Sequence, residues 1–247
     1  MLNLNMPINE VINEYPITRD FLEKNEIFCV DCSVGTCLLK DLFEIHNFSS
    51  GDQIAMFENL NDLVTQKTKE IKVFTPLTKK DKYSAIVEML IEEHRKITEL
   101  VYIAEYIIRQ PNFLIKYAQE VEKLLYFFKY YADDFHHGKE EDMLFYLFEK
   151  NDILKAMYQE HEQSREYRSK LVSSSDVKEI SQLITEYCLM LKDHIYKEDN
   201  ILFPYLDRNL TTEMLVEIDR KMQDLDLSIN DDVINFIEDF NNKEFSF

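Results

Sequence analysis

The chain has 247 residues, of which 45% are hydrophobic and 13% aromatic, so it can bury a substantial core. Its 3 glycines and 5 prolines compare with roughly 17 and 12 at average usage, which favours an all-α fold over a turn-rich β fold. The formal net charge of -19 argues against nucleic acid and against a membrane surface as partners, because both are bound through lysine and arginine.

Membrane and export signals are also missing from the sequence pattern. No run of about 18 apolar residues is present, and residues 1–10 lack the basic start and apolar core of a signal peptide. We therefore expect a cytoplasmic protein. In a reducing compartment the four cysteines are not expected to form structural disulfides.

The periodicity divides the chain into four parts. Residues 1–70 predict a small helical domain that carries cysteines, and residues 71–81 read as a linker. Residues 82–210 have the apolar spacing of a four-helix up-down bundle. Residues 211–247 predict a C-terminal extension of one or two helices that pack outside the bundle.

Three cysteines, Cys29, Cys32 and Cys37, lie close together in the N-terminal part. They fall in a turn between short helices expected at 18–24 and 38–45. A Cys-x-x-Cys pair at a helix start lowers the thiol pKa and favours disulfide exchange or metal ligation. The alternative is that the cysteines are small core residues. The pattern does not distinguish a redox disulfide from a metal site.

The bundle helices begin with a stripe of apolar residues that contains one histidine, His94. Pro111 marks the start of the second helix, the third spans about 152–171, and Pro204 is expected to end or kink the fourth. The first stripe repeats at alternating intervals of four and three: Tyr83, Val87, Leu90, His94, Ile97, Val101 and Ala104.

A histidine precedes a glutamate by four residues on both the second and the fourth helix. His136 pairs in this way with Glu140, and His194 with Glu198, so each pair shares one helix face. His137 with Glu141 has the same spacing, but its stripe is more polar. Matching the Lys-Glu sequence of the two motifs also selects His136, and His137 is expected to flank the site.

With His161 on the third helix, each helix brings one histidine to the inner face. Six buried polar groups without partners would cost a few kcal/mol each, whereas metal coordination removes that cost. Four imidazoles and two carboxylates exceed the needs of one tetrahedral zinc. We therefore expect two iron ions, oxo- or hydroxo-bridged, with manganese as the second choice. The predicted ligands are His94, His136, Glu140, His161, His194 and Glu198.

This ligand set resembles the di-iron site of hemerythrin-like proteins, and in particular of the iron-sulfur cluster repair (Repair of Iron Centers) family. Oxygen-carrying hemerythrins have a second histidine four residues along the third helix, where this chain has Arg165. The resemblance implies bridging roles for Glu140 and Glu198 and places Glu160 on a route for iron. The repair family has adjacent N-terminal cysteines, whereas Cys29 and Cys32 here have the spacing of small redox-disulfide domains.

The resemblance implies repair of iron-sulfur clusters damaged by nitric oxide or oxidative stress, through iron donation or nitric oxide reduction. Damaged iron-sulfur proteins, an electron donor and a small gaseous ligand, NO or O2, would be the partners, and oligomerisation is left open. The alternative is a protein that binds or senses oxygen or nitric oxide without turnover. The sequence leaves open whether the protein is an enzyme.

Overall fold

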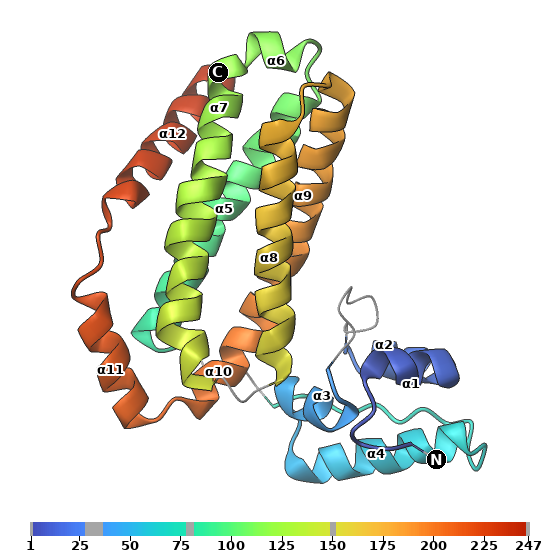
Figure 1. The fold of residues 1–247 in the computed structure, drawn as a ribbon. Helices are drawn as coiled ribbons and strands as arrows, with labels where there is room; N and C mark the ends of the chain where they lie inside the picture. The colour runs from blue at the N-terminus through green and yellow to red at the C-terminus, as the bar shows by residue number, and fades with distance from the viewer. Residues whose placement is uncertain (1, 28–36, 78–81, 149–151, 246–247) are drawn as a thin grey trace.

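The computed structural model describes residues 2–27, 37–77, 82–148 and 152–245, and in these ranges it is helical (Figure 1). The only β pairing among them is an isolated bridge between Pro7 and Leu38. The all-α prediction is therefore confirmed. No helix in the described ranges combines the length and apolar character needed to cross a membrane.

The described residues of the N-terminal part form four helices: α1 (Ile8–Glu14), α2 (Ile17–Lys24), α3 (Leu39–Ile45) and α4 (Ser50–Val64). The sequence pattern predicts a helix over residues 52–71, but the structure shows that this prediction is wrong, since α4 ends at Val64. The helix stops earlier because Gln66 takes a left-handed conformation, with φ of 58°. The chain then runs back over the domain, where the Asn59 side chain bonds Glu70 and Lys72.

The bundle has four helical columns that run alternately up and down (Figure 1). The first is α5 (Ala85–Ile108). The second begins with α6 (Phe113–Lys116) and α7 (Ala118–Phe127) and continues through η2 (Phe128–His137), η3 (Glu140–Leu144) and η4 (Phe145–Phe148). The third is α8 (Asp152–Ser173), and the fourth comprises α9 (Val177–Lys197), η5 (Glu198–Leu202) and α10 (Phe203–Asn209).

Pro204 neither ends the fourth column nor lies in an ordinary α-helical interior. It falls in the first turn of α10, where the missing N–H needs no partner. The preceding π-helical segment, η5, absorbs the change in hydrogen bonding. The Ser-Ser-Ser-Asp sequence at residues 173–176 predicts a turn and a helix N-cap. The structure confirms the cap, because the Asp176 carboxylate accepts bonds from the N–H groups of Lys178 and Glu179.

The bundle interior consists of two apolar clusters with a polar layer between them. On α5, Leu90 belongs to one cluster and Ile97 to the other, and His94 lies between them. The cluster around Leu90 also includes Ile45 from α3, so the N-terminal helices pack against this end of the bundle. The Arg208 side chain of α10 supports this contact by donating to the Glu44 carbonyl.

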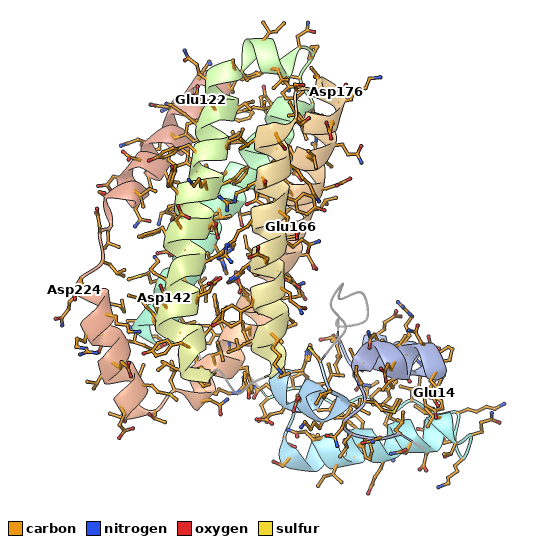
Figure 2. All side chains as sticks on the ribbon, in the orientation of Figure 1. Glu14, Glu122, Asp142, Glu166, Asp176 and Asp224 are labelled. Carbon is orange, nitrogen blue, oxygen red and sulfur yellow. The ribbon has the colours of Figure 1, made fainter. Side chains whose placement is uncertain are left out.

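Two further helices, α11 (Thr212–Met222) and α12 (Ser228–Phe245), lie along the outside of the bundle (Figure 1). Val233, Phe236 and Phe240 attach α12 to the cluster that contains Ile97. The negative charge is carried largely on the outer surface. Acidic side chains labelled in Figure 2 are exposed on both parts of the molecule: Glu14, Glu122, Asp142, Glu166, Asp176 and Asp224.

Candidate metal centre

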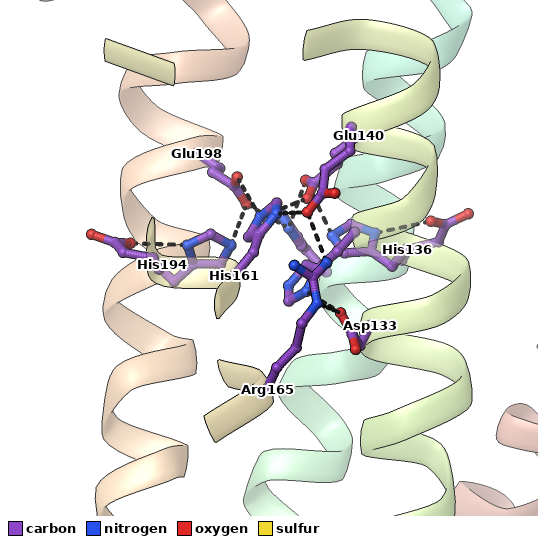
Figure 3. A network of polar contacts seen from close by, with 12 residues as sticks. Asp133, His136, Glu140, His161, Arg165, His194 and Glu198 are labelled. Atoms are coloured by element: carbon purple, nitrogen blue, oxygen red, sulfur yellow. Dashed lines mark hydrogen bonds and ion pairs between the residues drawn. The ribbon is translucent and has the colours of Figure 1, made fainter. Parts of the chain in front are cut away.

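The six side chains predicted as ligands meet in the polar layer of the bundle. Five of them are labelled in Figure 3, and the sixth, His94, contacts Glu140 and Glu198. None of them is more than 2% exposed. One histidine comes from α5 and one from α8, and each of the other two columns brings a histidine and a glutamate. The structure therefore assembles one group from four helices: His94, His136, Glu140, His161, His194 and Glu198.

Each glutamate lies between two histidines that come from different columns. Glu140 places Oε1 3.3 Å from Nε2 of His136 and Oε2 3.3 Å from Nε2 of His161. Glu198 places Oε2 3.2 Å from Nε2 of His94 and 3.1 Å from Nε2 of His194. A carboxylate with an imidazole on either side is positioned to bridge two cations.

The potential ligand atoms form two groups, each compact enough to surround one cation, and Glu140 belongs to both groups. In one set, single ligand atoms of His94, His136, Glu140 and Glu198 all lie within 4.8 Å of one another. In the other, Glu140 is joined by three histidines within the same limit: His137, His161 and His194.

The four predicted histidine ligands are oriented by carboxylates behind them. Nδ1 of His94 lies 2.7 Å from Asp199, and Nδ1 of His161 lies 2.7 Å from Glu141. Nδ1 of the remaining two histidines contacts a carboxylate at 3.0 Å in both cases: His136 with Glu93, and His194 with Glu160. A partner on Nδ1 fixes the ring and directs Nε2 inward as a metal ligand.

Sequence reasoning missed three of these four carboxylates, although a local signal was available. Each stands directly beside a predicted ligand in the chain. Glu93 precedes His94, Glu141 follows Glu140, and Asp199 follows Glu198. Glu160 was singled out for an iron route; in the structure it is 3% exposed, and its two oxygens contact His194 and Lys197.

Two lysines complete the support behind the histidines. Lys139 pairs with Glu93, and Lys197 pairs with Glu160. Each lysine immediately precedes one of the two central glutamates in the sequence. They offset part of the charge of the buried carboxylates. Burial acts to raise the pKa of Glu93 and Glu160, but the contacts with His136 and His194, and after them the lysines, lower it.

The inward atoms of the centre have no hydrogen bonds. Nε2 of all four predicted histidine ligands and both oxygens of Glu140 and Glu198 are buried without a hydrogen-bond partner. Their mutual contacts are ion pairs that lack hydrogen-bond geometry. Buried polar groups in proteins are almost always bonded, so this set of converging unpaired atoms fits a bound cation.

The charge balance leads to the same conclusion. Burial alone would lower the pKa of His94, but its contacts with Asp199 and Glu198 outweigh burial and raise the pKa to about 10. Burial and Glu198 both act to raise the pKa of Glu140, yet His136 and His161 bring it down to about 2. Protons on imidazoles thus supply the positive charge that the converging carboxylates require, and a metal ion would replace them.

His137 does not flank the centre as the sequence indicated. It is 1% exposed, and its ring stacks on His161 with centroids 4.0 Å apart. The prediction assumed an α-helical period, but residues 128–137 form a π-helix, with more residues per turn. In this wider turn both His136 and His137 border the interior. A fifth histidine is therefore buried beside the four predicted ligands.

The structure describes two of the four cysteines, Cys37 and Cys188. Cys29 and Cys32 lie outside the described residues. Cys37 is half-buried and packs against both the N-terminal core and the cluster around Leu90. Cys188 lies in the bundle core, where burial raises the pKa of its thiol to about 12 and leaves it unreactive at neutral pH.

Comparison with known families identifies the bundle. Residues 85–206 match the model of the hemerythrin HHE cation binding domain. The chain has no significant match among curated proteins or among solved structures. The matched range contains all six predicted ligands and the carboxylates behind them. Residues 85–206 are therefore similar to this cation-binding domain, and they contain a buried His and Glu cluster of a size that can hold a metal ion.

Proposed function

We propose that the bundle holds two iron ions bridged by Glu140 and Glu198. The observation that carries the proposal is the set of eight converging atoms, four imidazole Nε2 and four carboxylate oxygens, that are buried without hydrogen bonds. A nitrogen and oxygen donor set of this kind suits iron. Bound iron would supply redox chemistry and a coordination position for a small ligand.

We further propose that the protein acts in the repair of iron-sulfur clusters damaged by nitric oxide or oxidative stress, by donating iron or by reducing nitric oxide. The ligand set supports this role through its resemblance to the repair family. The chain's own residues hold the imidazoles in place through Nδ1. The rings of Phe145 and Phe203 stack on His161 and His94, where they exclude water from the inner layer.

The test begins with protein purified without oxygen. We expect two irons per chain and a visible spectrum typical of a bridged ferric pair after oxidation. The iron-loaded protein should then reactivate a cluster-dependent dehydratase that nitric oxide has inactivated. The double variant E140L/E198L is the matched control and should neither bind iron nor reactivate. Iron-loaded wild type that fails to reactivate the enzyme would exclude the repair role while leaving the iron site intact.

Binding of oxygen or nitric oxide without turnover is the second candidate. One observation favours this second function. The third column has Arg165 where oxygen-carrying hemerythrins have a second histidine, but the second column places a fifth imidazole, that of His137, beside His161. Reversible optical changes on adding and removing nitric oxide, with no product formed, would support this function over repair.

A further inference from the structure

The second column departs from α-helical geometry over most of the stretch that carries its ligands. Residues 128–137 and 140–144 are π-helical, and His136 and Glu140 lie within these two segments. The π-helix is rare in proteins and occurs mostly as a single turn inside an α-helix. The first segment here has 10 consecutive π-helical residues. A segment of this length implies support from another part of the molecule.

The fourth column provides an internal comparison. Columns one and two form one helical hairpin, columns three and four form the other, and the motif at residues 136–141 corresponds to that at 194–199. The fourth column stays α-helical through Lys197, and its π-helical segment, Glu198–Leu202, has 5 residues. The motif alone therefore does not account for the longer π-helical stretch of the second column.

The C-terminal extension, residues 211–245, lies along the second column (Figure 1). Lys221 of α11 donates from Nζ to the carbonyl oxygen of Asp142 in η3, at 2.6 Å. The same Nζ lies 3.7 Å from the centroid of the Tyr146 ring. A hydrogen bond from a charged donor is stronger than one between neutral groups. Lys221 therefore stabilises the backbone of the π-helical segment directly.

The other helix of the extension, α12, contacts the second column at the start of its π-helical stretch. Tyr131 is fully buried in η2, and its hydroxyl donates to Oδ1 of Asn230, at 3.0 Å. The ring of Phe236 packs on that of Phe127, the residue before η2, with centroids 5.3 Å apart. A buried hydroxyl requires a partner, so Asn230 fixes the position of Tyr131.

The ligands of the second column lie between these two hydrogen bonds along the chain. The equivalent positions of the fourth column face solvent instead. Leu189, which corresponds to Tyr131, is 57% exposed, and Asn200, which corresponds to Asp142, is also exposed. The column that the extension covers is thus the one with the long π-helical stretch.

We propose that the C-terminal extension is a brace that holds the second column in its π-helical register and so positions His136 and Glu140. Lys221 and Asn230 are the positioning residues, because they bond the column on either side of these ligands. The extension follows residues 85–206, which match the family model, so the brace is an addition to the matched domain. Its effect on the backbone does not require metal, whereas its effect on iron binding rests on the proposed two-ion site.

The test compares full-length wild type with K221M/N230L, which removes both hydrogen bonds and keeps side chains of similar size. Lys192→Met is the matched control, because Lys192 pairs with Glu105 between α9 and α5 and does not belong to the extension. Lys221→Arg, which retains a charged donor, tests for rescue. Amide hydrogen exchange of each metal-free protein is measured by mass spectrometry on peptides from residues 128–148, α8 and α9.

We expect exchange in residues 128–148 to be about tenfold faster in K221M/N230L, as the loss of two hydrogen bonds predicts, and unchanged in α8 and α9. Lys192→Met and Lys221→Arg should match wild type in residues 128–148. Equal exchange in wild type and K221M/N230L would overturn the inference. An increase spread evenly over all helices would overturn it too, since that result indicates a general loss of stability.

If K221M/N230L does not fold, the single variants K221M and N230L are measured in its place. Each should accelerate exchange in residues 128–148 by roughly threefold. No local increase in either variant would contradict the brace.

Iron titration, with the visible spectrum of the oxidised iron-loaded protein, tests the effect on the ligands. Iron affinity should fall by roughly threefold or more in K221M/N230L, less than the roughly 10- to 100-fold effect of a residue that contacts a ligand directly. The spectrum should shift in this variant and not in Lys192→Met.

The outcomes separate this inference from the proposed function. Wild type that binds fewer than two irons per chain contradicts the two-ion centre and leaves the exchange result intact. Wild type that binds two irons, with affinity and spectrum unchanged in K221M/N230L, contradicts the positioning of His136 and Glu140 by the extension.

Discussion

Asp199 orients His94 from the opposite helical hairpin, with Oδ1 2.7 Å from Nδ1 of the imidazole. Asp199 directly follows Glu198, whose own carboxylate contacts Nε2 of the same ring at 3.2 Å. Two consecutive acidic residues thus hold both nitrogens of one histidine. Glu141 and Glu140 hold His161 in the same way.

The paired arrangement predicts equal effects of two substitutions. Asp199→Ala and Glu141→Ala should each lower iron affinity by roughly 10- to 100-fold, as removal of such outer partners does at other metal sites. Anaerobic iron titration measures this loss. Asp142→Ala is the control, because Asp142 adjoins Glu141 but its side chain is exposed. A large effect of the control, or none of the two variants, would contradict the assigned role.

The metal-free protein should lose stability as the pH rises above about 6.5. The pKa of His94 is raised to about 10 in the folded chain, so this histidine stays protonated there after it has lost its proton in the unfolded chain. Its contribution is complete below about pH 6.5 and disappears as the pH passes about 10. Urea unfolding of the metal-free protein across this range should show the fall.

Iron affinity should change in the opposite direction over the same pH range. Binding must displace the proton from His94, so affinity rises with pH until that proton is lost. Calorimetry in buffers of different ionisation enthalpy would reveal the released protons. His94→Asn should reduce the pH dependence of stability in the metal-free protein without abolishing it, because the neighbouring carboxylates also raise the pKa of His161 and His194. A slope that is unchanged in this variant would contradict the role of His94.

The ring of Phe203, which covers His94, should contribute to iron affinity as well as to the free energy of folding. Phe203→Leu removes the stacking on His94 and should cost about 1 kcal/mol of folding free energy, together with a measurable loss of iron affinity. Phe127→Leu removes a buried ring of the distant apolar cluster and serves as the control. It should cost a similar free energy and leave iron binding unchanged. Denaturant unfolding and iron titration together separate the two effects.

The bundle and its six inward residues could be predicted because each depends on local spacing. His94 lies on an apolar stripe of period 3.6, and His194 with Glu198 repeats the spacing of His136 with Glu140. Such spacing predicts which residues share a helix face only while the number of residues per turn stays constant. His137 was misplaced because residues 128–137 change to a π-helix, and single-sequence patterns contain no direct sign of that change.

Other features depended on contacts between distant segments. The end of α4 at Val64 reflects the left-handed turn at Gln66 and the return of the chain across Asn59. The orienting role of Asp199 requires knowing that α5 and η5 face each other. The functions of Cys29 and Cys32 stay predictions, since both residues lie outside the described ranges.

Each hairpin supplies the carboxylates that hold a histidine of the other hairpin, and this arrangement has a consequence for assembly of the site. His94 and His136 come from the first hairpin, but Glu198 and Asp199, which hold His94, come from the second. The converse is true of His161, which is held by Glu140 and Glu141. Neither hairpin alone supplies all the side chains that surround either proposed ion. Separating the hairpins would therefore break both groups of predicted ligands at once, so we expect iron loading and bundle closure to be a single cooperative step.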